Sequence, residues 1–279
     1  MEILFFRNMT RKIAYHHQGV DYYRMSVYRL NKNVQTVYTF FVDDVLIDTA
    51  QRHNRENIYE ITKSRAINKI LLTHHHEDHS GNLNYLMRKL NVKAYGHQNA
   101  HDILKEGYVI SPLSSYFSGN VDKANIDVVQ DNEEIETKKH KLRAIYTPGH
   151  SDDHFCYYEE NEGWLFSGDL YVADKIKYFA RFESLLTQIE SLKKLVQLDF
   201  DTLFCSHNPK VVNGKQHLRN KLQFFEDFAQ TVIRHYNNGL SQKEIFQEMG
   251  LKENYVNKYV TLGGFCAENM VYSVLRDIK

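Results

Sequence analysis

Residues 73–82, THHHEDHSGN, place four histidines and two acidic residues within ten positions. The spacing can be written His74-x-His76-x-Asp78-His79. Residues two apart on an extended segment point to the same side, so we expect His74 and His76 to bind one metal ion. Asp78 and His79 follow a predicted turn, and we expect them to face a second ion.

Three further residues of ligand type follow apolar runs elsewhere in the chain: His150 in YTPGH, Asp169 in FSGD and His207 in FCSHNP. Each run predicts a buried strand, and a sheet brings binding groups together where its strands end. An HxH pair alone is typical of a solvated loop, but separate signals at several strand ends argue against that interpretation. Imidazole nitrogen and carboxylate oxygen suit zinc best, with iron and manganese as alternatives. We therefore expect two divalent metal ions, which together provide a nucleophilic hydroxide at neutral pH.

The combination of HHHEDH with TPGH, SGD and SHNP resembles the metallo-β-lactamase superfamily of metallo-hydrolases. The resemblance runs from the first predicted strands to about His207. It implies an α/β fold, the αββα sandwich, with a two-metal site on one edge. By position, the resemblance implies that the first metal is bound by His74, His76 and His150. It implies that the second metal is bound by Asp78, His79 and His207, and that Asp169 is the carboxylate that bridges the two.

The residues at two of these positions indicate which branches of the superfamily the sequence resembles. His76 stands where the flavodiiron branch usually has glutamate, which counts against an oxygen-reducing diiron role. Asp169 stands where true β-lactamases have cysteine, so hydrolysis of antibiotics is not expected. The glyoxalase II, lactonase and RNA-processing branches have aspartate there. The resemblance therefore favours a glyoxalase II-like or lactonase-like protein with a C-terminal helical region.

Side chains next to the predicted ligands have less specific roles. His75 and Glu77 alternate with the ligands and are expected to point away from the ions. Tyr171 and His154 are the candidates for substrate contacts, because a tyrosine there could donate to an oxyanion and glyoxalase-like proteins often carry a histidine at the second position. A structural role is the alternative for both. Asp78 is also expected to act in catalysis by taking a proton.

The elements that must position these residues follow from the apolar periodicity of the chain. Strands are expected at 23–48, 69–73 and 92–96, from residue 142 into the turn at Pro148–Gly149, and from residue 201 to His207, with a hairpin over 153–169 that turns at Asn161–Gly163. Helices are expected at 54–64, 82–90, 97–107 and 182–197. Residues 107–125 are interpreted as a long loop, and such a loop could cover the metals as a lid.

The alternation of strands and helices predicts a mixed α/β sandwich over residues 1–213 and a helical region over 214–279. In that region Ser241 and Glu244 have the spacing of a capping box, and Gly250 is expected to end the helix. Residues 240–260 resemble a helix–turn–helix, but packing against the metal-binding face is the favoured alternative.

Composition limits the possible partners of the protein. The formal net charge of the 279 residues is zero, so no electrostatic field attracts nucleic acid or an anionic membrane. The sequence has no apolar stretch long enough to span a bilayer, and the apolar run within residues 1–12 is too short for a signal peptide. Three cysteines lie far apart and suggest no disulfide, which favours a cytoplasmic protein. We expect a small-molecule substrate and neither a nucleic-acid nor a membrane partner.

These features predict a hydrolase (EC class 3) that cleaves an ester, thioester or lactone bond of a small molecule through a metal-bound hydroxide. A metal-dependent phosphodiesterase or ribonuclease is the alternative enzyme, and the neutral charge argues against it. A low-turnover, metal-containing regulator is the alternative from another class, since a ligand set alone does not prove turnover.

Overall fold

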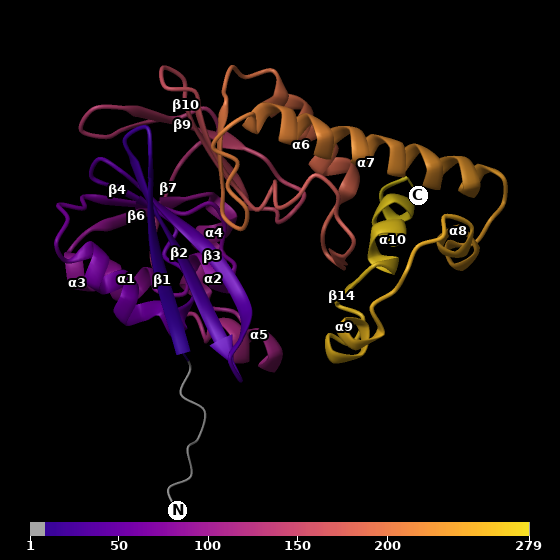
Figure 1. Ribbon diagram of the computed structural model, residues 1–279, viewed down its shortest axis with the longest axis horizontal. Helices are drawn as coiled ribbons and strands as arrows, with labels where there is room; N and C mark the ends of the chain where they lie inside the picture. The colour runs from indigo at the N-terminus through magenta and orange to yellow at the C-terminus, as the bar shows by residue number, and fades with distance from the viewer. Residues whose placement is uncertain (1–8, 279) are drawn as a thin grey trace, which may run out of the picture.

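Two sheets form the centre of the molecule, which is described here by a computed structural model over residues 9–278 (Figure 1). The first sheet is antiparallel from its N-terminal edge to its middle and parallel beyond it. Its strands follow each other in chain order: β1 (Met9–His17), β2 (Val20–Arg29), β3 (Lys32–Val42), β4 (Val45–Ile47), β5 (Lys69–Leu71), β6 (Lys93–Gly96) and β7 (Asp127–Val128).

The second sheet pairs antiparallel strands except at one edge, where β11 and β13 run parallel. Its spatial order is β13 (Thr202–Cys205), β11 (Trp164–Gly168), β10 (Phe155–Glu159), β9 (Lys141–Tyr146) and β8 (Glu134–Glu136). A separate short ribbon joins β12 (Phe179–Ala180) to β14 (Phe265–Cys266).

The helices lie on the outer faces of the sheets and in the C-terminal region. Their bounds are η1 (Arg52–Asn54, a 3-10 turn), α1 (Arg55–Thr62), α2 (Glu77–Ser80), α3 (Leu83–Leu90), α4 (Gln98–Glu106), α5 (Pro112–Ser118), α6 (Leu185–Val196), α7 (Gly214–Asn237), α8 (Gln242–Glu248), α9 (Tyr255–Val260) and α10 (Glu268–Asp277). Among the described residues, no helix is long and apolar enough to cross a membrane.

Three apolar clusters separate four layers. Between the two sheets, Phe40 meets Phe166 and Phe204, and the latter two rings stack with centroids 4.9 Å apart. On the outer face of the first sheet, Ile58 of α1 and Leu86 of α3 belong to one buried cluster. On the outer face of the second sheet, α6, α7 and α10 share another cluster. This arrangement confirms the predicted αββα sandwich.

Most predicted elements occur close to their expected positions, but three expectations were wrong. The strand region begins at Met9 rather than at residue 23, because β1 is a largely exposed edge strand with a weak apolar pattern. The expected loop 107–125 contains α5, which begins at Pro112 with Ser111 as its cap. The helical C-terminal region also contributes the strand β14.

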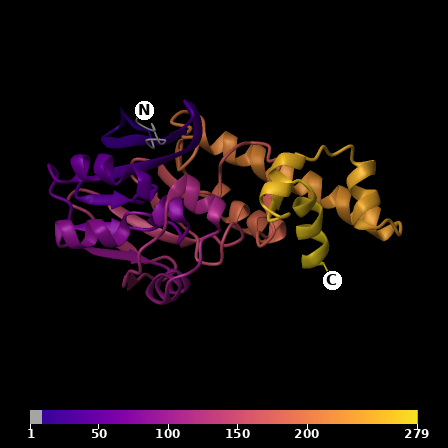
Figure 2. The same ribbon diagram turned by 90° about the horizontal axis from the view of Figure 1, so that it is seen from below.

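The C-terminal region begins with α7, which lies along α6 and β13 before it continues beyond the sandwich (Figures 1 and 2). Leu218 and Phe225 of α7 belong to the same cluster as Val271 of α10, so one core joins this region to the second sheet. The capping box of Ser241 and Glu244 is present, as expected. The division after residue 213 stays a prediction, and the signal-peptide expectation falls partly on residues 1–8, outside the described chain.

Candidate metal centre

The seven predicted ligands lie together at the edge where strands of both sheets end. Side chains from β5, β9, β11 and β13 meet there, since each strand is followed directly or within a few residues by a ligand-type side chain. Three groups have ligand atoms within 4.8 Å of one another: His74, His76 and His150; His74, His79 and Asp169; and Asp78, His79 and His207.

The local backbone explains why neighbouring residues reach two different groups. His74 lies three residues after the end of β5, and His76 is the N-cap of α2 with φ −53° and ψ 151°. His74 and His76 therefore lie on the extended side, with Nε2 of the first 2.9 Å from Nδ1 of the second. Asp78 and His79 lie within the single turn of α2 and face the other group. The turn expected from the sequence is thus a short helix.

Asp169 lies between the two histidine groups. Its Oδ1 is 3.4 Å from His79 Nε2, and its Oδ2 is 3.2 Å from His207 Nε2 and 3.6 Å from His150 Nε2. The preceding Gly168 has φ +47°, and a Cβ there would lie 2.5 Å from His154 Nε2. A side chain at position 168 would therefore disturb the backbone that places Asp169.

Asp48 holds His79, and the sequence analysis did not identify it. Nδ1 of His79 lies 2.8 Å from Asp48 Oδ2, and both side chains are fully buried. Asp48 also accepts hydrogen bonds from the backbone N–H and the hydroxyl of Thr73, both at 2.8 Å. The carboxylate thereby fixes the ring so that Nε2 faces the centre. An acidic residue directly after a buried strand was a signal that could have indicated it.

Two other imidazoles are held in the same way. Nδ1 of His207 lies 2.6 Å from the carbonyl oxygen of Thr36, so Nδ1 donates and Nε2 faces Asp169. Nδ1 of His150 lies 3.2 Å from Glu183 Oε2. No local sequence pattern indicated Glu183, which belongs to the loop before α6. A carboxylate or carbonyl behind the ring is the usual support of a metal-binding histidine.

The electrostatic environment gives the histidines different pKa values. Burial and the neighbouring histidines lower the pKa of His74 and His76 well below the ordinary value, which keeps both rings neutral. Burial by itself would lower the pKa of His207, but the charge and hydrogen bond of Asp169 have the larger effect and raise that pKa to about 9. Burial by itself would raise the pKa of Asp169, but the charges and hydrogen bonds of His207 and His79 have the larger effect and lower that pKa. The Asp169 carboxylate is therefore ionised.

The centre fits a divalent cation in its donors and in its unsatisfied atoms. His79 Nε2 and Asp169 Oδ1 are buried and have no hydrogen-bond partner among the described residues. Two such atoms 3.4 Å apart, one imidazole nitrogen and one carboxylate oxygen, are costly unless something binds both. A shared cation would satisfy them, and nitrogen with oxygen donors suits zinc, iron or manganese.

The neighbours of the ligands occupy separate positions. The backbone N–H and ring of His75 contact Asp153, at 2.7 and 3.0 Å. His75 belongs to none of the three ligand groups. Burial and the nearby Asp78 raise the pKa of Glu77. Tyr108, in the expected lid segment, donates to the carbonyl of His75 at 2.9 Å, so part of that segment lies beside the centre.

Both candidates for substrate contacts are buried. Nε2 of His154 accepts the backbone N–H of Asp169 at 3.1 Å, and burial together with His150 lowers the His154 pKa to about 3. The hydroxyl of Tyr171 donates to Asp174 at 2.6 Å. These contacts support the loop that carries Asp169, and the substrate contacts stay predictions.

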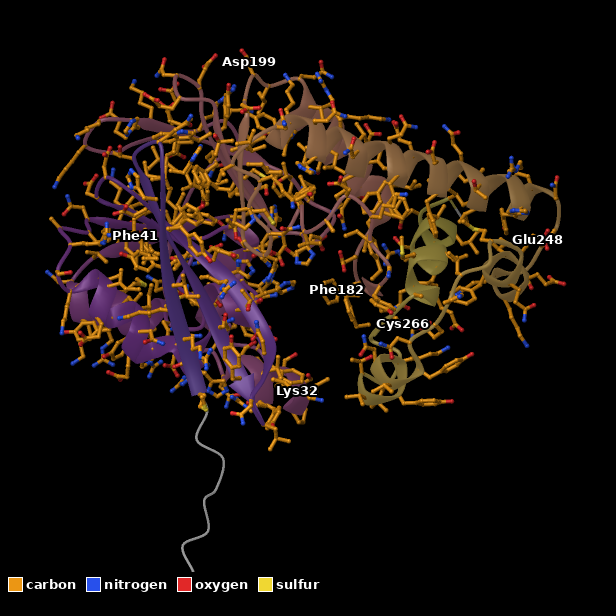
Figure 3. The ribbon with its side chains drawn as sticks, in the orientation of Figure 1. Lys32, Phe41, Phe182, Asp199, Glu248 and Cys266 are labelled. Atoms are coloured by element: carbon orange, nitrogen blue, oxygen red, sulfur yellow. The ribbon has the colours of Figure 1, made fainter. Side chains whose placement is uncertain are left out.

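A cavity of about 420 Å³ adjoins the centre. His150, Asp169 and His207 line it, Ile176, Phe179 and Phe265 form an apolar part of its wall, and the remaining lining includes charged side chains. Phe182 lies between the sandwich and the C-terminal helices, and its ring centroid is 5.6 Å from that of His76 (Figure 3). The cavity size and apolar wall are typical of a small-molecule site.

Comparison with known proteins agrees with this architecture. The sequence profile described as "Metallo-beta-lactamase superfamily" matches residues 35–207. A beta-lactamase domain protein from Burkholderia ambifaria has a similar structure, with a TM-score of 0.63, 17% identity, and 78% of each chain covered. A metallo-beta-lactamase family protein from Thermus thermophilus has a TM-score of 0.58 and 20% sequence identity, with 71% of this chain and 77% of that chain covered. A subclass B3 metallo-beta-lactamase of Bradyrhizobium japonicum has a TM-score of 0.54 and 16% sequence identity, with 74% of this chain and 90% of that chain covered.

Proposed function

The chain belongs to the metallo-β-lactamase superfamily, and from that premise we propose that it hydrolyses an ester, thioester or lactone bond of a small molecule. One observation carries the proposal. The buried Asp169 carboxylate lies between two histidine groups and faces a largely apolar cavity. Fold similarity alone does not identify a reaction, so the argument depends on the site.

The chain's residues divide the work of such a reaction. Two bound divalent ions, with zinc proposed first, would supply a nucleophile from water and polarise a carbonyl oxygen. His74, His76 and His150 would hold one ion, Asp78, His79 and His207 the other, and Asp169 both. The buried supports Asp48 and Glu183 keep the ring nitrogens aimed at the centre. Asp78 retains partial exposure at the centre, with its carboxylate 3.5 Å from His207 Nε2, and is proposed to take a proton during the reaction.

The substrate class follows from the cavity and the charge. A volume of about 420 Å³ suits a small acyl or lactone compound rather than a polymer. A nuclease must hold phosphates along a strand, and that affinity comes from extended basic surfaces. The formal net charge of this chain is zero. We therefore favour a small-molecule substrate over nucleic acid, and the glyoxalase II-like or lactonase-like branch over the RNA-processing branch.

A substrate panel on one metal-analysed preparation tests the proposal. Thioesters, lactones, phosphodiesters and single-stranded RNA should be compared by kcat/KM at physiological salt. We expect at least one thioester or lactone to be the fastest, with activity lost in His76→Ala. RNA cleavage that exceeds every acyl substrate and disappears in His76→Ala would support the nuclease instead. Full metal content without turnover of any substrate would support the low-turnover regulator.

A further inference from the structure

Three lysines line the cavity beside the centre, together with three of the predicted ligands. Lys221 of α7 lines it together with Lys175 and Lys177 from the segment between β11 and β12. The two latter lysines are exposed, and no ion pair engages either of them within the described residues. The cavity therefore offers positive charge near the position where a substrate would meet the centre.

Lys221 is the unusual member of this set because it is only 2% exposed. Within residues 9–278, no carboxylate lies within ion-pair distance of its ammonium group. The ammonium donates instead to the carbonyl of Leu170 and to Gln188 Oε1, the latter at 3.3 Å. Burial lowers the Lys221 pKa to about 8. A buried cation without an anion is costly, so its retention needs a reason.

The hydrogen bonds leave Lys221 with capacity for a ligand. An ammonium group has three donors; Leu170 and Gln188 accept from two of them, and the ammonium nitrogen also lies 4.8 Å from the centroid of the Phe225 ring, which accepts no conventional hydrogen bond. The one carboxylate besides Asp169 in this cavity, Glu183, is already occupied: its Oε1 accepts the Ala180 N–H at 2.8 Å, and its Oε2 accepts from the Gln188 amide at 2.9 Å. Within the described residues no ion pair joins Glu183 to Lys221, although the charge of Glu183 offsets part of the lowering of the Lys221 pKa by burial.

Acidic side chains line another cavity beside the centre. A second cavity of about 410 Å³ is lined by His76 and Phe182, together with Asp102, Asp152 and Asp153. Among the described residues, neither lysine nor arginine lines it. An anionic group would be repelled there and attracted to the lysine side. The charges of the two linings therefore favour the lysine-lined cavity for an anionic group of a substrate.

We propose that the cavity on the Lys221 side binds an anionic group of the substrate, a carboxylate or a phosphate monoester, with the Lys221 ammonium as its direct partner. The substrate is then an anionic acyl compound whose apolar part contacts Ile176 and Phe265. Lys175 and Lys177 attract the anion from the rim. This inference rests on the proposed hydrolase function, because it assigns the substrate class of the same site.

Ligand binding to the full-length, metal-loaded protein tests the inference without turnover. Calorimetry should compare four probes with the same apolar chain: octanoate, octyl phosphate, octanol and octylammonium. We expect one or both anions to bind at least about tenfold more tightly than octanol, and octylammonium to bind most weakly, because hydrogen bonds to charged groups contribute more than neutral ones. Lys221→Met should weaken the preferred anion by about tenfold or more and leave octanol binding unchanged.

Lys215→Met is the matched control, since Lys215 lies on the same helix but lines neither of the two cavities beside the centre. Its anion binding should equal that of the unaltered protein. Preference for octanoate indicates a carboxylate and preference for octyl phosphate a phosphate, and both support the inference. Octanol binding as tightly as the anions would overturn it, as would unchanged anion binding in Lys221→Met.

Metal analysis of each variant separates ligand binding from support of the centre. Gln188 links Lys221 to Glu183, which contacts His150, so a purely structural Lys221 would lose metal when replaced. Loss of metal with unchanged anion binding per metal-loaded chain would overturn the inference. If Lys221→Met does not fold, the double variant Lys175→Ser/Lys177→Ser should still weaken anion binding severalfold, and no change would count against it. Anion binding without hydrolysis of any acyl substrate would reject only the proposed function.

Discussion

Asp48 and His79 form a fully buried pair in which the carboxylate oxygen Oδ2 lies 2.8 Å from the ring nitrogen Nδ1. The pair joins the residue after β4 to the turn of α2, and it leaves the unpartnered Nε2 of His79 facing Asp169. The carboxylate therefore controls which ring nitrogen is available to a metal ion.

Replacement of this carboxylate should weaken metal binding. Asp48→Asn can donate where the native residue only accepts, so His79 loses its fixed tautomer, and we expect a loss of about 10- to 100-fold in affinity. Competition with a chelator measures it. Asp43→Asn is the matched control, because Asp43 holds His140 Nδ1 at 2.9 Å away from the three ligand groups. Equal metal affinity in the two variants would contradict the assigned role.

Asp169→Ala tests the shared ligand. Two positive ions without a carboxylate between them repel each other more strongly, so we expect metal content to fall from about two ions per chain and activity to fall with it. Elemental analysis of protein purified without chelator measures the content. Unchanged occupancy and turnover would show that Asp169 does not bridge.

His75 and Glu77 test the register of the motif. His75 contacts Asp153 instead of the centre, so His75→Ala and Glu77→Ala should retain metal with at most about a 10- to 100-fold loss in affinity. His74→Ala should lose metal, because that ring belongs to two of the ligand groups. Metal loss in His75→Ala combined with retention in His74→Ala would place the ligands one residue further along.

Lys221 predicts a pH-dependent stability. Burial lowers its pKa from 10.5 to about 8 in the native chain. Below pH 8 the lysine is charged in both states and its burial destabilises the native state. Between these pKa values the unfolded chain binds a proton that the native chain has released, so stability rises with pH. The free energy of unfolding of Lys221→Met should therefore exceed that of the unaltered protein by roughly 2–3 kcal/mol less at pH 10 than at pH 7.

Denaturant unfolding of both proteins across this range measures the difference. The groups that act on Lys221 are Glu183, Cys205, Asp169 and Cys156. Burial raises the pKa of both thiols to about 12, so they stay neutral over the interval. A difference that does not change with pH would show that Lys221 is not buried as a cation.

The sequence by itself indicated the candidate ligands and the layers. Spacing within residues 74–79 is local, and a change from extended chain to a helical turn at His76 is enough to divide those ligands into two groups. The apolar runs before His150, Asp169 and His207 indicated strand ends, which meet at one edge in a sandwich. Local periodicity encodes these features, because each depends on residues close together in the chain.

Only the tertiary structure decided which residues support the ligands and what the cavity contains. Asp48 reaches His79 because β4 pairs in parallel with β5, Ile47 beside Leu71, and Glu183 reaches His150 through the loop before α6. Lys221 has the local pattern of a surface lysine on an amphipathic helix, and only the packing of α7 on α6 buries it in the wall of the cavity beside the centre. Such contacts depend on sheet register and helix packing between distant segments, and no local pattern in the sequence specifies the partner.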